Sequence, residues 1–275
     1  MTTVGFLYPG HFAEDDFPRM EILLDSTIRL VVNHTECPDD AYREDALRAL
    51  GTPERLAAGA EELQRSGVES VVWACDGGSF LYGPQGARAQ AATVARALGV
   101  PVSSTSIGFV HAVRKLGAAR VVVAATYPEE IAAHFTAFLR DEGVEVLATH
   151  AAGAATAAEA AAWGPDRLKE LVTAADRPDA DAVLLPDTAL HTVGHLAELE
   201  QLLGKPVLTA NQVAVREALR LADRHAWAAR LGTLFAAREA PPAPAEPPAR
   251  GVWGSGRKYA HGQNAYGRGS GSAGQ

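Results

Sequence analysis

Residues 71–80, VVWACDGGSF, run from an apolar β-branched stretch through a cysteine into a glycine-rich turn. The same outline returns at residues 183–190, VLLPDTAL, where an apolar stretch leads through a proline to an aspartate. The polar positions that follow these stretches, Cys75 and Asp187, lie 112 residues apart (187 − 75). Because ligands bind beyond the carboxyl ends of strands in open parallel sheets, the two strand ends predict one site shared by two related halves.

Other segments repeat in the same order. They are the helix openings at 51–56 and 164–168, the Gly-x-Pro-Val segments at 98–102 and 203–207, and the Tyr-Pro turns at Tyr8 and Tyr127. Generic α/β regularity accounts for one such match, whereas several matches in one order favour an internal duplication. We therefore expect each half to begin with a strand that ends in a Tyr-Pro turn. A later helix then leads to a strand that ends in the reactive loop.

The fold class follows from the alternation of short β-branched runs with longer amphipathic segments. Expected strands are 4–8, 28–33, 70–74, 100–103, 120–125, 144–149, 182–185 and 206–209; expected helices are 53–66, 87–98, 108–116, 128–142, 165–175, 193–203 and 212–222. Apolar strands separated by helices are typical of parallel sheets covered on both faces. The sequence predicts an α/β protein of two pseudo-symmetric halves, each a mostly parallel sheet flanked by helices, with the active-site cleft between them.

The predicted domain boundaries follow the repeat. Residues 1–105, with a return helix at about 211–235, form the first half, and residues 106–210 form the second. Residues 239–275 are first proline-rich and then rich in glycine and serine, with too few apolar groups to build a core. We expect this tail to be disordered and to have no catalytic role.

Charge and termini restrict the partners. The formal net charge of −8 argues against nucleic acid or an anionic membrane as a main partner. The sequence has no apolar run of about 18 residues, and its N-terminus lacks the features of a signal peptide. Two cysteines, Cys37 and Cys75, are too few for a disulfide framework. We expect a cytoplasmic protein with free thiols, and the sequence leaves a homo-oligomer open.

Residues 71–80, the turn at Tyr127 and residues 184–190 resemble the Asp/Glu racemase superfamily. Within it, the chain is most similar to the branch of maleate cis–trans isomerase, arylmalonate decarboxylase and the ectoine-utilisation protein EutA. The resemblance covers roughly residues 3–223. It implies a small carboxylate substrate, no cofactor, and catalysis by cysteines, one from each half in most members and a single one in the decarboxylases.

The chain departs from the family pattern at two places. Cys75 matches the first cysteine, but Asp187 stands at the second cysteine position. The hydroxyl-bearing positions after the first cysteine, which would hold a substrate carboxylate, are Asp76 and Gly77 here. These departures argue against a symmetric two-thiol racemase.

The predicted catalytic residues are Cys75 and Asp187, acting from opposite faces of the substrate. The predicted substrate-binding residues are Tyr127, Asp76, Gly77, Gly78, Ser79, Thr188, Tyr8 and Asn211. Converging backbone N–H groups of the glycine-rich loop would lower the pKa of the thiol and steady negative charge. The alternatives are an inert buried cysteine, a helix-cap or turn carboxylate at Asp187, and tyrosines that only anchor turns.

Other sequence features give weaker evidence for a functional role. Cys37 has no counterpart in the second half, and residues 14–16, EDD, suggest a solvated turn or, alternatively, a lid over the cleft. His191 and His195 are one helical turn apart but lack a third metal ligand, so no metal is predicted. No glycine-rich phosphate-binding motif follows a strand, so no nucleotide cofactor is predicted.

Three functions remain open. The first is an isomerase of the maleate-isomerase type, in which the Cys75 thiolate adds to an activated carbon or moves a proton there. The second is an arylmalonate-type decarboxylase with Cys75 as the proton donor. The third is a non-catalytic carboxylate-binding protein. An enzyme is expected to have a Cys75 that alkylates quickly at neutral pH.

Overall fold

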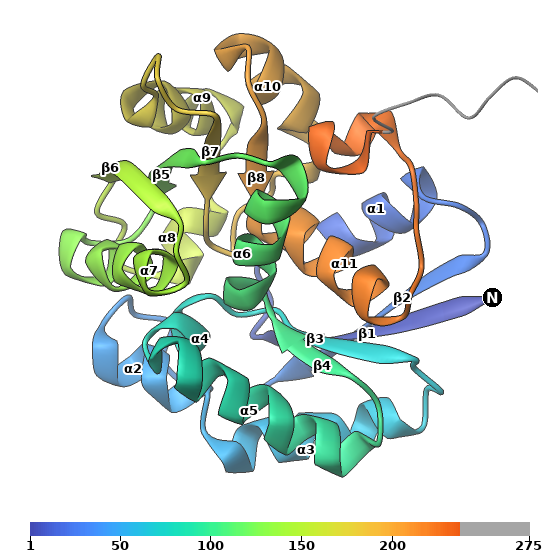
Figure 1. The fold of residues 1–275 in the computed structure, drawn as a ribbon. Helices are drawn as coiled ribbons and strands as arrows, with labels where there is room; N and C mark the ends of the chain where they lie inside the picture. The colour runs from blue at the N-terminus through green and yellow to red at the C-terminus, as the bar shows by residue number, and fades with distance from the viewer. Residues whose placement is uncertain (237–275) are drawn as a thin grey trace, which may run out of the picture. The chain divides into compact units, whose positions relative to one another are not determined.

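Two four-stranded parallel sheets form the framework of the chain (Figure 1). The computed structural model describes residues 1–236, so the predicted tail at 239–275 lies outside the described residues. The first sheet has the order β2-β1-β3-β4, built from β1 (Thr2–Pro9), β2 (Ile28–Thr35), β3 (Ser70–Trp73) and β4 (Val102–Ser104). The second has the order β6-β5-β7-β8, built from β5 (Arg120–Ala125), β6 (Glu145–Ala151), β7 (Ala182–Leu185) and β8 (Val207–Thr209).

The two sheets have the same strand order, since β5 to β8 take the places of β1 to β4. The predicted α/β fold of two related halves is therefore confirmed, and each of the eight predicted strands is present. The middle strands β3 and β7 are buried along their whole length, as expected for parallel strands covered on both faces. Trp73 pairs with Leu7 at the carboxyl end of the first sheet, next to the Cys75 loop.

Helices connect and cover the strands. They are α1 (Asp16–Leu23), α2 (Glu44–Leu50), α3 (Pro53–Gln64), α4 (Gly77–Phe80), α5 (Gly83–Leu98), α6 (Thr105–Leu116), α7 (Glu129–Asp141), α8 (Ala157–Ala161), α9 (Pro165–Ala175), α10 (Leu196–Leu203) and α11 (Ala210–Leu221). Pro53 and Pro165 occupy the first turn of α3 and α9, where the missing N–H is tolerated. The short helices α1, α2, α4 and α8 were not expected from the sequence.

The last helix returns to the first sheet. Although α11 follows β8, it contacts β3, β4 and α6, and Figure 1 shows α6 and α11 side by side. The Ser70 hydroxyl donates to the carbonyl of Ala218 at 2.7 Å and fixes α11 on β3. The helix ends at Leu221, close to the end of the predicted helix 212–222. The rest of the return segment at about 211–235 contains 3₁₀ turns at Ala229–Leu231 and Thr233–Phe235. Every helix within residues 1–236 is too short or too polar to span a bilayer.

Candidate active site

A small cavity brings the two predicted catalytic residues together. It has a volume of about 30 Å³, and both Cys75, after β3, and Asp187, after β7, line it. The rest of its wall is formed by Pro9, Phe12, Cys37, Asp40, Tyr42, Leu47, Leu50, Asp76, Gly77, Tyr127, Ala157, Thr188 and Ala189. This volume holds about one water molecule. A substrate with an aryl group therefore requires the wall to open.

Cys75 is buried, with 4% of its surface exposed. Burial raises the pKa of its thiol well above the ordinary value, and the backbone N–H of Gly78 opposes this shift only in part. The Asp187 carboxylate, and Asp76 once it ionises, raise the pKa further. At neutral pH the side chain is therefore a thiol that can give up a proton, rather than a standing thiolate. The predicted lowering of this pKa by the loop N–H groups is wrong, because desolvation outweighs them.

Gly78 lets the backbone approach the thiol. A Cβ atom at this position would lie 3.2 Å from Cys75 Sγ and 2.5 Å from the Trp73 ring. Gly77 lines the cavity itself, and a Cβ there would lie 2.8 Å from Leu47. The two glycines are thus required by close packing around the reactive loop. Ser79 is buried beside them, with its hydroxyl donating to Ser104 Oγ at 2.7 Å.

Three donors hold the carboxylate of Asp187. Its Oδ2 accepts from the Tyr42 hydroxyl at 2.5 Å and from Thr126 Oγ1 at 2.6 Å. Its Oδ1 accepts from the backbone N–H of Ala189 at 2.9 Å. Burial raises the pKa of Asp187, and these hydrogen bonds lower it. With a φ of 105°, Asp187 is in a region that disfavours side chains, so the surrounding contacts hold a strained turn.

Asp76 bridges the two reactive loops. Its Oδ2 accepts a hydrogen bond of 2.9 Å from the backbone N–H of Asp187, whereas its Oδ1 has no partner among the described residues. Burial raises the pKa of Asp76 to about 8; the Asp187 N–H lowers it, and the Asp187 charge raises it. The Ser106 hydroxyl donates to the Asp76 carbonyl at 3.1 Å and anchors its backbone. Asp76 is therefore mainly a neutral carboxylic acid at pH 7.

The remaining predicted binding residues fall into two groups. Tyr127 and Thr188 line the cavity, and the Tyr127 ring packs edge-on against Tyr42 at 4.8 Å. Tyr8 lies behind the wall, where its hydroxyl donates to the Thr188 carbonyl at 2.7 Å and accepts from Ala13 N at 2.9 Å. Asn211 also donates to the Thr188 carbonyl, at 3.1 Å. Tyr8 and Asn211 therefore position Thr188.

The sequence missed several residues of the site. Tyr42 and Thr126 donate hydrogen bonds to Asp187, and Cys37, which has no counterpart in the second half, lines the cavity. Thr126 stands directly before the predicted Tyr127, which is the one signal that could have indicated it. Tyr42 carries no such signal.

Asp16, expected in a solvated turn, is 1% exposed. Its carboxylate accepts from the backbone N–H of Thr192 at 3.0 Å and from Asn211 Nδ2 at 3.2 Å. The hydrogen bond from Thr192 therefore fixes the start of α1 to the loop that follows Asp187.

The histidines within residues 1–236 lie outside the cavity lining. His191 pairs with Asp15, with 2.7 Å between Nδ1 and Oδ1. His11, Glu14 and His34 have ligand-type atoms within 4.8 Å of one another, but none of the three lines the cavity.

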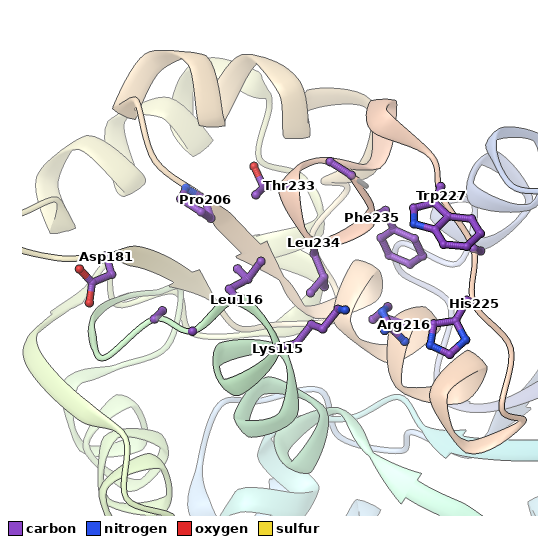
Figure 2. Close-up of a pocket in the computed structure, with 14 residues that line it drawn as sticks. Lys115, Leu116, Asp181, Pro206, Arg216, His225, Trp227, Thr233, Leu234 and Phe235 are labelled. Atoms are coloured by element: carbon purple, nitrogen blue, oxygen red, sulfur yellow. The ribbon is translucent and has the colours of Figure 1, made fainter. Parts of the chain in front are cut away.

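A larger hollow lies elsewhere and contains none of the predicted site residues. It has a volume of about 320 Å³ and lies at the C-terminal end of α6, beside α11. Figure 2 shows Lys115, Arg216 and His225 on one side of it, near Trp227 and Phe235. This hollow contains no cysteine, and its one acid, Asp181, precedes β7 rather than following a strand. The smaller cavity, which contains Cys75, Asp76 and Asp187, is therefore the candidate active site.

Comparisons with known proteins identify the family of the chain. The family model of arylmalonate decarboxylase matches residues 51–235. The arylmalonate decarboxylase of Bordetella bronchiseptica is 28% identical over 165 residues, which are 59% of this chain and 69% of that protein. The family-model match includes both reactive loops.

Solved structures share the fold. A crystal structure of arylmalonate decarboxylase superposes with a TM-score of 0.68 at 25% identity, covering 85% of this chain and 98% of that one. A variant of the maleate isomerase Iso from Pseudomonas putida, solved with maleate, gives a TM-score of 0.77 at 19% identity, covering 85% and 97%. A cysteine-to-serine variant of the Nocardia farcinica maleate cis–trans isomerase, with a covalently bound succinylcysteine intermediate, gives 0.74 at 19% identity, covering 81% and 93%.

The predicted resemblance is confirmed by the family model, which spans more than half of the chain and includes Cys75 and Asp187. The maleate isomerases add evidence for the fold. The chain belongs to the arylmalonate decarboxylase family.

Proposed function

We propose that the protein is a cofactor-independent decarboxylase of a 2-substituted malonate, in which the Cys75 thiol delivers a proton to the product. The observation that carries this proposal is the burial of Cys75 in the wall of the cavity. In place of a second thiol the cavity has Asp187, whose carboxylate already accepts hydrogen bonds from Tyr42 and Thr126. A decarboxylase needs one acid for one face of its intermediate. A racemase needs a matched pair.

The reaction balances with the groups of the cavity. The bond between the α-carbon and one carboxylate breaks, CO2 leaves, and the electron pair is held as an enediolate of the remaining carboxylate. The S–H proton of Cys75 then moves to the α-carbon, which forms the C–H bond of the product. The resulting thiolate takes a proton from water, so one proton is consumed in each turnover.

The apolar wall supports the loss of CO2. Phe12, Leu47 and Leu50 line the cavity and offer no side-chain hydrogen-bond donor to a carboxylate. A carboxylate placed against them loses its hydration, whereas the transition state disperses the charge toward the α-carbon. The Tyr127 hydroxyl makes no hydrogen bond within residues 1–236, so it is free to donate to the enediolate.

The isomerase interpretation has weaker support. Addition of sulfur to maleate requires a thiolate, and burial raises the pKa of Cys75 away from that state. The similarity to maleate isomerases, at 19% identity, supports the fold alone.

A substrate panel separates the candidates. Phenylmalonate and maleate are incubated with the protein and followed by NMR; we expect phenylacetate and CO2 from phenylmalonate, and no fumarate. Cys75→Ser should lower turnover by about 10³-fold or more, while the cavity-lining control Cys37→Ser should stay within about tenfold of the natural protein. Fumarate formation would favour the isomerase, and binding without any turnover would favour a carboxylate-binding protein.

A further inference from the structure

The two oxygens of Asp76 have different environments. Oδ2 is fixed by the backbone N–H of Asp187 at 2.9 Å, and Oδ1 has no hydrogen-bond partner in the part of the chain that the structure describes. The residue is 1% exposed and lines the cavity together with Cys75. Because Oδ2 is taken, Oδ1 is the oxygen left for a ligand. A buried polar atom without a partner is costly unless a ligand satisfies it.

The charges around Asp76 are negative or neutral. From the loop after β7 it faces the Asp187 carboxylate, and on its own loop it follows the Cys75 thiol. Tyr127 follows β5, and Tyr42, Asp40 and Cys37 complete the titratable groups of the wall. The lining contains no lysine, arginine or histidine. A carboxylate substrate therefore meets no side-chain cation here and has to be held by neutral donors.

We propose that Asp76 binds the substrate as a carboxylic acid, with Oδ1–H donating a hydrogen bond to a carboxylate oxygen of the ligand. This role rests on the proposed function, because it assigns the donor for the carboxylate that the decarboxylase retains. It also gives a reason for an acid at this position, since a protonated carboxyl replaces the hydroxyl donor that the family resemblance implies. Oδ2 keeps its hydrogen bond to the Asp187 N–H, so the acid is held in one orientation.

Ionisation of Asp76 would remove the donor and add a negative charge. With a pKa of about 8, Asp76 is mainly protonated at pH 7 and mainly ionised at about pH 9. Burial raises the pKa values of Cys75, Tyr42 and Tyr127 well above their ordinary values, so these groups stay protonated through that range. Affinity for an anionic ligand should thus be constant below about pH 7 and fall by about tenfold per unit above about pH 8.

The test measures binding of phenylacetate by calorimetry between about pH 6 and about pH 10. Phenylacetate carries the retained carboxylate and has no second carboxylate to lose. The informative variant is Asp76→Asn, whose amide N–H2 replaces the acid donor and whose oxygen can still accept from the Asp187 N–H. We expect Asp76→Asn to bind within about fivefold of the natural protein at pH 7 and to lose the alkaline fall.

Two further variants complete the test. Asp76→Leu has a similar size and no donor, and it should bind at least about tenfold more weakly at every pH. Asp40→Asn removes another carboxylate from the same wall and should keep the alkaline fall. Circular dichroism checks that each variant is folded.

The proposal is overturned by any of three results: affinity that stays flat to about pH 9.5, an equal alkaline fall in Asp76→Asn, or no phenylacetate binding at about pH 7. Because phenylacetate undergoes no decarboxylation, this outcome is independent of turnover. An arylmalonate that is not turned over, combined with the expected pH dependence of binding, would contradict the proposed function and leave the role of Asp76 intact.

Discussion

The backbone N–H of Asp187 donates a hydrogen bond of 2.9 Å to the side chain of Asp76, although the two residues are 111 positions apart. This contact joins the reactive loop after β3 to the corresponding loop after β7. It places two acidic side chains together in a buried cavity with the Cys75 thiol. Its consequences can be measured through thiol reactivity, stability and pH dependence.

Thiol labelling tests the environment of Cys75. Because burial raises its pKa and leaves only 4% of its surface exposed, Cys75 should react slowly with iodoacetamide at neutral pH. This reverses the fast alkylation that the sequence predicted. Cys37 is only partly buried and should be labelled first. Peptide mass spectrometry over time gives both rates, and labelling of Cys75 as fast as Cys37 would contradict the described geometry.

Gly78→Ala tests the close approach of the loop to the thiol. The added Cβ would lie 2.5 Å from Trp73 and 3.2 Å from Cys75 Sγ, so the loop has to shift. We expect the free energy of unfolding to fall by about 1–3 kcal/mol and turnover to fall by at least about tenfold. Gly164→Ala is the matched control, since a Cβ there meets nothing within 4 Å. Equal urea-unfolding curves for the two variants would show that the loop accommodates the added methyl group without strain.

Asp187→Asn tests the coupling between the two acids. The Asp187 charge raises the pKa of Asp76, so removing the charge should lower that pKa and start the alkaline loss of phenylacetate binding at a lower pH. Tyr42 and Thr126 would lose a charged acceptor, which should lower the free energy of unfolding by about 1–3 kcal/mol. An unchanged binding profile would mean that the two acids are not coupled.

The stability of the protein should also depend on Asp76. Its folded-state pKa of about 8 exceeds the unfolded value of about 4, so its contribution to stability is complete below about pH 4 and is lost as pH rises to about 8. Within this window the group should lower the free energy of unfolding by up to about 1.4 kcal/mol per pH unit. Asp76→Asn lacks this dependence. Urea unfolding at several pH values compares the slopes, and parallel slopes would contradict the raised pKa.

Much of the fold could be predicted from the sequence because its signals are local. The apolar β-branched runs mark the strands, and the predicted ranges 120–125 and 182–185 match β5 and β7 residue for residue. Helix α1 was missed because it is eight residues long, contains Pro18 and begins with an acid that the sequence placed in solvent. Asp16 is buried because its partner, Thr192, comes from a loop 176 residues away.

The candidate site was predictable only in part, because some of its contacts join residues that are far apart in the sequence. The repeat pointed to Cys75 and Asp187, and both line one cavity. The hydrogen bond from Tyr42 to Asp187 spans 145 residues and leaves no pattern in the chain. The balance between burial and the Gly78 N–H at Cys75 depends on the packed environment, so the direction of the pKa shift required the structure.

The central claim is that Cys75 delivers a proton to one face of a decarboxylated intermediate. The most direct measurement is the turnover of 2-methyl-2-phenylmalonate in D2O, with the product analysed by chiral chromatography and mass spectrometry. We predict 2-phenylpropionate of a single configuration with one deuterium at the α-carbon, and loss of this product in Cys75→Ala. A racemic product, or undiminished formation of one enantiomer by Cys75→Ala, would contradict the account.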